Sequence, residues 1–203
     1  MKRVANDDAP RWSLANALSG FRLVIAAPLM LVFAIAGERE LFLWMLVASF
    51  FTDFIDGTVA RLSGRPNRFG AMLDSWADVT AYVSIAISVW LLWPELVRRE
   101  WVPFTAIVAS FVTPSLVGLA KFGRFTSYHT LLVKAAVAAT AAGLLLLLWG
   151  GPAWPFRLAA ALALLAALEE IAITSVLDEP RSNVRGIYAV WHSRRRGGGA
   201  GHP

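Results

Sequence analysis

Four aspartates lie between positions 53 and 78, in stretches that are otherwise rich in apolar residues: Asp53, Asp56, Asp74 and Asp78. Carboxylates placed together where water is scarce repel one another unless a cation neutralises them. The chain contains no cysteine, and no histidine lies among these residues. Oxygen ligands alone favour Mg²⁺ or Mn²⁺ over Zn²⁺. The stretch therefore predicts a divalent-metal site.

Small residues and an arginine accompany the aspartates. Gly57 and Ala60 follow the first pair, and two more small residues, Gly70 and Ala71, precede the second pair. Residues of this size let a bulky group approach the backbone, although they also suit a close crossing of two helices. Arg61 adds a planar cation that is suited to phosphate. Together with a divalent metal, these residues indicate a site for a diphosphate.

Long apolar segments must hold these residues, because the chain of 203 residues is 57% hydrophobic and only 16% charged. A membrane-spanning helix needs about 20 mostly apolar residues. That criterion gives six stretches: 14–36, 40–61, 69–93, 102–120, 127–149 and 156–177. We therefore expect an all-α polytopic membrane protein whose six transmembrane helices form one bundle within residues 1–180. The remaining residues, 181–203, are rich in arginine and glycine and are expected to be a disordered basic tail.

The formal net charge of +5 indicates membrane topology, and no nucleic-acid partner is expected. If the N-terminus lies inside the cell, most lysines and arginines fall in cytoplasmic segments. The outer joints then hold only four basic residues: Arg39, Arg98, Arg99 and Arg157. Tryptophans collect at the same joints and suit an interfacial belt: Trp90, Trp93, Trp101, Trp149 and Trp154. Both termini are therefore expected to be cytoplasmic.

The four aspartates lie on the second and third predicted helices, which form a hairpin with a turn near Arg65. Residues three or four apart share a helix face, so each pair of aspartates does so. Counting from the turn places Asp56 level with Asp74, and places Asp53 level with Asp78. At 1.5 Å per residue, the latter two lie about 12 to 14 Å from the cytoplasmic ends of their helices. All four carboxylates are therefore expected to converge.

Four further charged residues interrupt the predicted helices at a similar depth: Arg22, Lys134, Glu169 and Glu170. The same rise per residue places them about 10 to 14 Å from the cytoplasmic face. We therefore predict one hydrated, charged layer that opens to the cytoplasm. Within it, the two cations would pair with the glutamates or bind substrate phosphate, and both possibilities stay open. The prediction fails if both glutamates face lipid.

At these positions the chain resembles a known family, the CDP-alcohol phosphatidyltransferases. Its signature is matched by the spacing Asp53-x2-Asp56-Gly57-x2-Ala60-Arg61-x8-Gly70-x3-Asp74-x3-Asp78. Members of that family transfer a substituted phosphoryl group from a CDP-linked donor to an alcohol and release CMP, and they use a divalent metal. They are typically homodimers with a polar cavity that opens to the cytoplasm. The resemblance implies a phospholipid-synthesising transferase in a membrane, which we expect to be a bacterial inner membrane.

The resemblance also implies a role for each residue of the pattern. Asp53, Asp56 and Asp74 would ligate one or two Mg²⁺ or Mn²⁺ ions beside the donor diphosphate. Asp78 would be the general base that takes the proton of the acceptor hydroxyl, and a further ligand if two ions bind. The cytidine diphosphate portion of the donor, which we expect to be CDP-diacylglycerol, would contact a set of five residues: Asp53, Gly57, Ala60, Arg61 and Gly70.

The acceptor alcohol is less well defined by the sequence. Lys121 and Arg124, at the inner joint of the fourth and fifth predicted helices, could bind the phosphate of an anionic acceptor, as could Arg22 and Lys134. Lys121 and Arg124 could instead be cytoplasmic basic residues that only set the membrane topology, without binding a ligand.

Three features of the sequence bear on the acceptor. "NALSGFRLVIAAP", residues 16–28, resembles the N-terminal segment of phosphatidylglycerophosphate synthases, with Ser19 where threonine is usual. Those synthases usually have proline and lysine at the places of Ser75 and Val79, and "DSWADV" is closer to serine-using members. Users of inositol phosphate commonly have arginine in place of Val79. Glycerol 3-phosphate is favoured slightly, while serine, inositol phosphate or another polar alcohol remains open.

Two other classes of protein fit part of the pattern. A cation transporter or proton-coupled carrier also places carboxylates and basic residues at one membrane depth. Such a carrier needs access from both faces, whereas the predicted outer half is apolar and rich in tryptophan. A scaffold that binds a CDP-lipid without turnover is the other alternative. Metal-dependent release of CMP distinguishes the enzyme from both.

Overall fold

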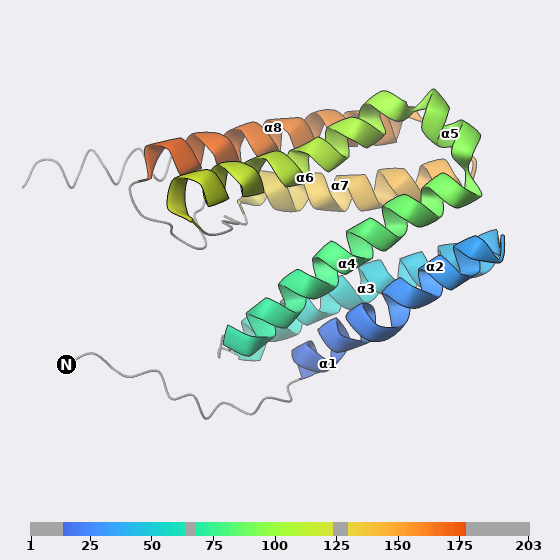
Figure 1. Ribbon diagram of the computed structural model, residues 1–203, viewed down its shortest axis with the longest axis horizontal. Helices are drawn as coiled ribbons and strands as arrows, with labels where there is room; N and C mark the ends of the chain where they lie inside the picture. Colours follow the sequence, from blue (N-terminus) through green and yellow to red (C-terminus); the bar gives the residue numbers. More distant parts are fainter. Residues whose placement is uncertain (1–13, 64–67, 124–129, 178–203) are drawn as a thin grey trace, which may run out of the picture. The chain divides into compact units, whose positions relative to one another are not determined.

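The computed structural model describes residues 14–63, 68–123 and 130–177, and every element in these ranges is helical (Figure 1). The elements are α1 (Leu14–Phe21), η1 (Arg22–Ala26), α2 (Ala27–Ile35), α3 (Arg39–Ser63), α4 (Arg68–Leu92), α5 (Pro94–Arg99), α6 (Trp101–Phe122), α7 (Leu131–Leu148) and α8 (Trp154–Val176). Near the α3–α4 turn the description covers the backbone only, for residues 54, 56–63, 68–69, 71 and 74–75. The all-α expectation is confirmed.

Each of the six apolar stretches coincides with a helix or a continuous helical rod, to within a few residues at either end. Four helical segments in the described part are long and apolar enough to cross a membrane: Asn16–Ile35, Trp101–Phe122, Leu131–Leu148 and Trp154–Val176. In α4 only Trp76–Leu92 forms a shorter apolar helix. The rest of α4 and the second half of α3 contain the residues whose side chains are not described, so this criterion does not cover either helix over its full length. The chain is therefore an all-α membrane protein, with four candidate transmembrane helices among the residues that the structure describes.

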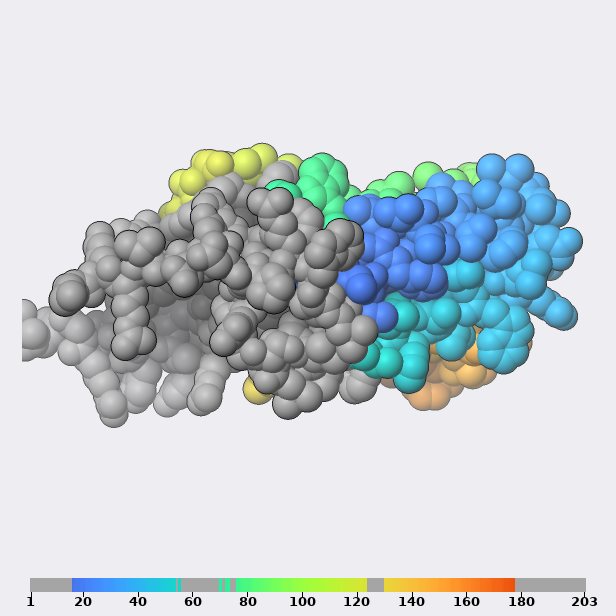
Figure 2. Space-filling model, turned by 90° about the horizontal axis from the view of Figure 1, so that it is seen from below, coloured from blue at the N-terminus to red at the C-terminus, as the bar shows by residue number. Residues whose placement is uncertain are grey.

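The helices fall into two compact units, residues 1–98 and 99–203. In the first unit, α1, η1 and α2 form one rod that packs against both α3 and α4 (Figure 1). In the described part, α3 and α4 have far fewer contacts with each other than either has with this rod. Figure 2 shows the rod, in blue, beside the described part of α3 in cyan. The first helix is thus the common partner of the two helices that carry the aspartates.

A glycine turn ends this rod and reverses the chain into α3. Gly37 has a φ of 76°, a left-handed conformation that glycine adopts without a steric penalty. The N–H of Glu38 donates to the carbonyl of Phe33 at 2.9 Å, and the N–H of Gly37 donates to the carbonyl of Ala34 at 3.2 Å. These bonds satisfy carbonyls at the helix end that would otherwise lack a partner. The turn allows α3 to run back along the rod.

The second unit consists of α6, α7 and α8, with α8 packed against both of the others. Alanines make this packing close: Ala136, Ala163 and Ala166 form a buried cluster that Ile107 and Leu162 help to cover. Small side chains let helix backbones approach each other, which is the usual way that helices associate in membranes.

Large apolar side chains on the outside of both units are consistent with lipid contact. Val24, Trp44 and Trp76 are exposed in the first unit, as are Leu131 and Leu168 in the second. In water, exposed apolar side chains of this size in such number would favour aggregation, whereas hydrocarbon chains solvate them. The surface therefore agrees with the hydropathy in placing the chain in a membrane.

Candidate active site

Three polar residues of the first helix are buried, although the rest of that helix is apolar. Asn16, Ser19 and Arg22 are spaced three apart and so lie on one side of the helix. The rod to which they belong contacts α3 and α4, the helices that carry the four aspartates. Sequence reasoning noted the depth of Arg22 but missed Asn16 as a site residue. The available signal was this repeat of polar residues in an apolar stretch.

Arg22 binds two of the predicted site residues at once. Its Nη1 pairs with Oδ1 of Asp53 on α3, and its Nη2 donates to Oδ1 of Asp78 on α4 at 2.5 Å. The arginine side chain is 2% exposed, whereas the two carboxylates are 41% and 37% exposed. The guanidinium is therefore buried behind the carboxylates, which keep an open side. The structure brings Asp53 and Asp78 together, as the antiparallel register predicts.

The helix that carries Arg22 changes its geometry at this residue. Residues 22–26 form a π-helix, in which the N–H of Ala27 donates to the carbonyl of Arg22, five residues earlier. Pro28 follows directly and has no N–H for the preceding turn. A π-turn inserts one extra residue into the helix and so changes the direction in which side chains point, and it often occurs at functional sites. Counting residues along the helix gives the depth of Arg22 in the membrane but could not have predicted this change in the direction of its side chain.

Gly70 lies directly against Asn16. A β-carbon added to Gly70 would be 2.5 Å from Oδ1 of Asn16, closer than a β-carbon can approach an oxygen without overlap. The resemblance assigns Gly70 to donor binding, and the structure adds a packing reason for a glycine there. Five other predicted site residues near this turn lie outside the side chains that the structure describes: Asp56, Gly57, Ala60, Arg61 and Asp74.

The carboxylates whose side chains are described suit a hard divalent cation. Asp53 and Asp78 supply only oxygen, and if both are ionised they keep one net negative charge beside Arg22. Asp56 and Asp74 stand one helical turn away on the same helices, with side chains outside the described ones. Among the side chains that are described, no three or more of His, Cys, Asp or Glu come together. The set of four metal ligands therefore stays a prediction.

The family of the chain follows from a comparison with known proteins. Residues 12–176 match the model of the CDP-alcohol phosphatidyltransferase family, which spans all the helices described above. The chain belongs to the CDP-alcohol phosphatidyltransferase family. The chain is thus a member of an enzyme family, and the aspartates of α3 and α4 lie within the matched residues.

Two kinds of curated relative resemble part of the chain. One is a CDP-diacylglycerol–serine O-phosphatidyltransferase of Helicobacter pylori, 34% identical over 90 residues, which are 41% of this chain and 35% of the relative. The other is a CDP-diacylglycerol–glycerol-3-phosphate 3-phosphatidyltransferase of Cereibacter sphaeroides, 41% identical over 80 residues, 37% of this chain and 35% of the relative. The chain thus spans about a third of the length of these relatives. No solved structure matches the chain.

The cations predicted to bind an acceptor have different surroundings. Lys121, at the end of α6, donates from Nζ to the carbonyls of Thr174 and Ser175, both at 2.9 Å. Those carbonyls lie in the last turn of α8, where a cation is favourable to the helix dipole. Lys134 is exposed on α7, and Arg124 lies outside the described residues. A phosphate-binding role for these cations stays a prediction for this family member.

Glu169 faces the helices of its own unit. Its Oε2 accepts a hydrogen bond of 2.7 Å from Oγ1 of Thr130, which also caps the N-terminus of α7 by accepting from Val133. Glu169 and Glu170 are both partly buried, which is expected of carboxylates that do not face lipid. The predicted charged layer would fail if both glutamates faced lipid, and the hydrogen bond of Glu169 to Thr130 shows that they do not both face lipid. A charged layer common to both units stays a prediction.

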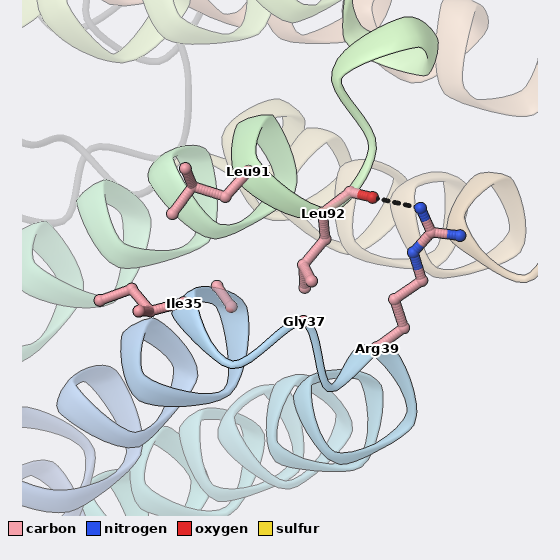
Figure 3. A pocket seen from close by; sticks show the side chains of 6 residues that line it. Ile35, Gly37, Arg39, Leu91 and Leu92 are labelled. Carbon is pink, nitrogen blue, oxygen red and sulfur yellow. Dashed lines mark hydrogen bonds between the residues drawn. The ribbon is translucent and has the colours of Figure 1, made fainter.

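A hollow at the other end of the first unit is distinct from the aspartates. It measures about 720 Å³ and is lined by Ala34, Ile35, Gly37, Arg39, Leu91 and Leu92. Figure 3 shows its polar group, Arg39, whose Nη2 donates to the carbonyl of Leu92 at 2.7 Å. Arg39 begins α3, so at 1.5 Å per residue it lies roughly 21 Å along that helix from Asp53. The hollow therefore belongs to the turn between α2 and α3.

Proposed function

We propose that the chain transfers a phosphatidyl group from CDP-diacylglycerol to a small polar alcohol and releases CMP. The acceptor oxygen forms a bond to the phosphorus of the phosphatidyl group, and the bond from that phosphorus to the CMP oxygen breaks. CMP leaves with the bonding electrons, and the hydroxyl proton passes to a base. The family, together with the meeting of Asp53 and Asp78 at one buried cation, supports this reaction.

Asp78 is the base in this proposal, because it combines a fixed position with access. One oxygen is held by Arg22 and the side chain is 37% exposed, so the carboxylate can receive a proton from a substrate on its open side. Asp53, Asp56 and Asp74 would hold Mg²⁺ or Mn²⁺, as one or two ions. When bound, the metal supplies positive charge beside the donor diphosphate. Gly57, Ala60, Arg61 and Gly70 would contact the donor in the remaining part of the site.

The membrane arrangement belongs to the same proposal. Six spans within residues 1–180, a basic tail at 181–203 and cytoplasmic termini would place the aspartates near the cytoplasmic surface of a bacterial inner membrane. The charged ends of α3 and α4 support that placement, because a polar site needs water and a route for water-soluble substrates. A homodimer is expected from the family resemblance.

Glycerol 3-phosphate is the acceptor that we propose, and serine is the second candidate. The relative from Cereibacter sphaeroides, whose name includes glycerol 3-phosphate, supports the first. The relative from Helicobacter pylori, named for serine, supports the second. An anionic acceptor would also give a function to the cations Lys121, Arg124 and Lys134.

A panel of acceptors tests the reaction. Purified protein in detergent would receive CDP-diacylglycerol and Mg²⁺ with glycerol 3-phosphate, serine, inositol phosphate or no acceptor, and CMP and lipid product would be measured. We expect CMP release that requires both Mg²⁺ and one acceptor. CDP-lipid binding without CMP release from any acceptor would indicate the scaffold, and ion flux in liposomes would indicate a transporter.

A further inference from the structure

We propose that Arg22 is a positioning residue that holds the base Asp78 and the metal ligand Asp53 in register across two helices. This inference rests on the proposed function. It differs from the roles that the sequence left open for Arg22, which were a partner for the glutamates or a ligand for substrate phosphate.

The two terminal nitrogens of Arg22 are directed to different helices. Nη1 pairs with Asp53 of α3, and Nη2 donates to Asp78 of α4. Only arginine offers two coplanar donors with a permanent charge in a rigid fork, so one side chain can fix two carboxylates at a set separation. A guanidinium with both ends engaged by carboxylates has little capacity left for an acceptor phosphate.

Burial makes this arrangement costly to change. Arg22 is 2% exposed, and a buried cation needs compensating anions. The two aspartates supply them, while their open sides remain available to substrate and metal. The described parts of α3 and α4 contact each other little, so Arg22 is a direct link between their carboxylates. The geometry of the site therefore depends on the first helix as well as on the hairpin.

The proposal separates turnover from binding of the metal. Loss of Arg22 removes a positive charge beside the carboxylates, and this change cannot weaken the attraction of a divalent cation through the electrostatic term. The same loss frees Asp78 to move, and small displacements of a catalytic group lower the rate by orders of magnitude. A positioning role thus predicts lower kcat without weaker metal binding. A phosphate-binding role predicts a higher KM for the acceptor.

The experiment compares the wild type with Arg22→Gln, Arg22→Lys and the matched control Arg39→Gln. Arg39 also links α3 to α4, through the carbonyl of Leu92, but at the far end of the unit. Kinetics of CMP release would give kcat and the acceptor KM, and electron paramagnetic resonance would give the Kd for Mn²⁺ in the absence of lipid substrate. Thermal unfolding and size-exclusion chromatography would check the fold of each variant.

We expect Arg22→Gln to lower kcat about 100-fold, with acceptor KM within about 3-fold of the wild type and Mn²⁺ bound at least as tightly. Arg22→Lys should have about a tenth of the wild-type kcat, because lysine restores the positive charge but not the two coplanar donors of the guanidinium. The control should match the wild type in all three quantities.

Three results would overturn the proposal: an unchanged kcat with a raised acceptor KM, weakened Mn²⁺ binding, or a wild-type kcat in Arg22→Lys. If Arg22→Gln does not fold, Arg22→Lys carries the test, since it keeps the buried charge balanced. A wild-type protein that binds Mn²⁺ but releases no CMP would instead contradict the proposed function.

Discussion

At the scale of single residues, the contact between Gly70 and Asn16 favours one of the two roles that the sequence left open for this glycine, a close helix crossing, beside donor binding. The amide of Asn16 fills the space that a side chain at position 70 would need. The first helix therefore forms a third wall of the site, next to the two helices with the aspartates. The glycine could have two functions, helix packing and donor binding, and these are separable by experiment.

Gly70→Ala should lower thermal stability, because its β-carbon would overlap Oδ1 of Asn16; overpacking of this kind costs about 1–3 kcal/mol. Adding Asn16→Ala should restore much of that stability by removing the overlapping atoms. If donor binding also needs the glycine, CMP release stays low in the double variant. Gly20→Ala is the control, since nothing lies within 4 Å of its added β-carbon. An unchanged melting temperature in Gly70→Ala would contradict the packing argument.

The sequence predicted the meeting of Asp53 and Asp78 because an antiparallel hairpin fixes which residues are level. It could not predict that both would bind Arg22. Counting residues gives depth along a helix, whereas a contact also depends on the direction around the helix axis. The π-turn at residues 22–26 changes that direction, and no simple periodicity in the sequence marks it.

At the scale of helices, the turn that carries Arg22 is itself testable. Pro28→Ala would supply an N–H that can bond four residues back and favour a regular α-helix over the π-turn. Loss of the extra residue in that turn would direct Arg22 away from the aspartates. We expect CMP release to fall about 10-fold with helix content unchanged by circular dichroism. A wild-type rate in this variant would show that the π-turn does not determine the position of Arg22.

An ion pair between Glu100 and Arg157 joins the start of α6 to the start of α8. Glu100 is 2% exposed and accepts two hydrogen bonds of 2.8 Å from Arg157, through Nε and Nη2. The Arg157 guanidinium, hydrogen-bonded to Glu100, holds the pKa of that carboxyl below its usual value, although burial opposes this shift. The pair fixes two helix ends that lie next to the contact between Phe104 and Phe156.

This pair predicts a pH dependence of stability. A carboxyl with a lowered pKa in the folded state stabilises the protein above its ordinary pKa, about 4.3, and loses that contribution as the pH falls through the lowered value. Glu100→Gln should therefore melt below the wild type at pH 7, and the difference should shrink toward pH 4 and below. Glu95→Gln, which removes an exposed partner of Arg98, should change little. A constant difference across this pH range would contradict the assignment.

At the scale of the whole chain, the fold was predictable to the extent that apolar length determines it. The long apolar stretches became helices with nearly the expected ends, because about 20 apolar residues in a membrane have few alternatives to a helix. The ends of α3 (Arg39–Ser63) and α4 (Arg68–Leu92) also lie within two residues of the expected 40–61 and 69–93, so the aspartates do not interrupt either helix.

The family assignment extends across both compact units, from residue 12 to residue 176. The signature itself lies in the first unit, where α3 and α4 meet the polar side of α1. The second unit contains Lys121, Lys134 and Glu169, whose side chains differ in burial and partners. The acceptor could not be predicted, because Ser75 and Val79 together do not match the residues usual in any one acceptor class of the family.

The most direct test of the account is metal-dependent CMP release by the wild type and by Asp78→Asn. The wild type should release CMP from CDP-diacylglycerol only when Mg²⁺ or Mn²⁺ and an alcohol are both present. Asp78→Asn keeps the size of the side chain and an oxygen for Arg22, but it cannot accept the proton, and its rate should fall about 100-fold or more. CMP release by Asp78→Asn at the wild-type rate would contradict the central claim that Asp78 is the base.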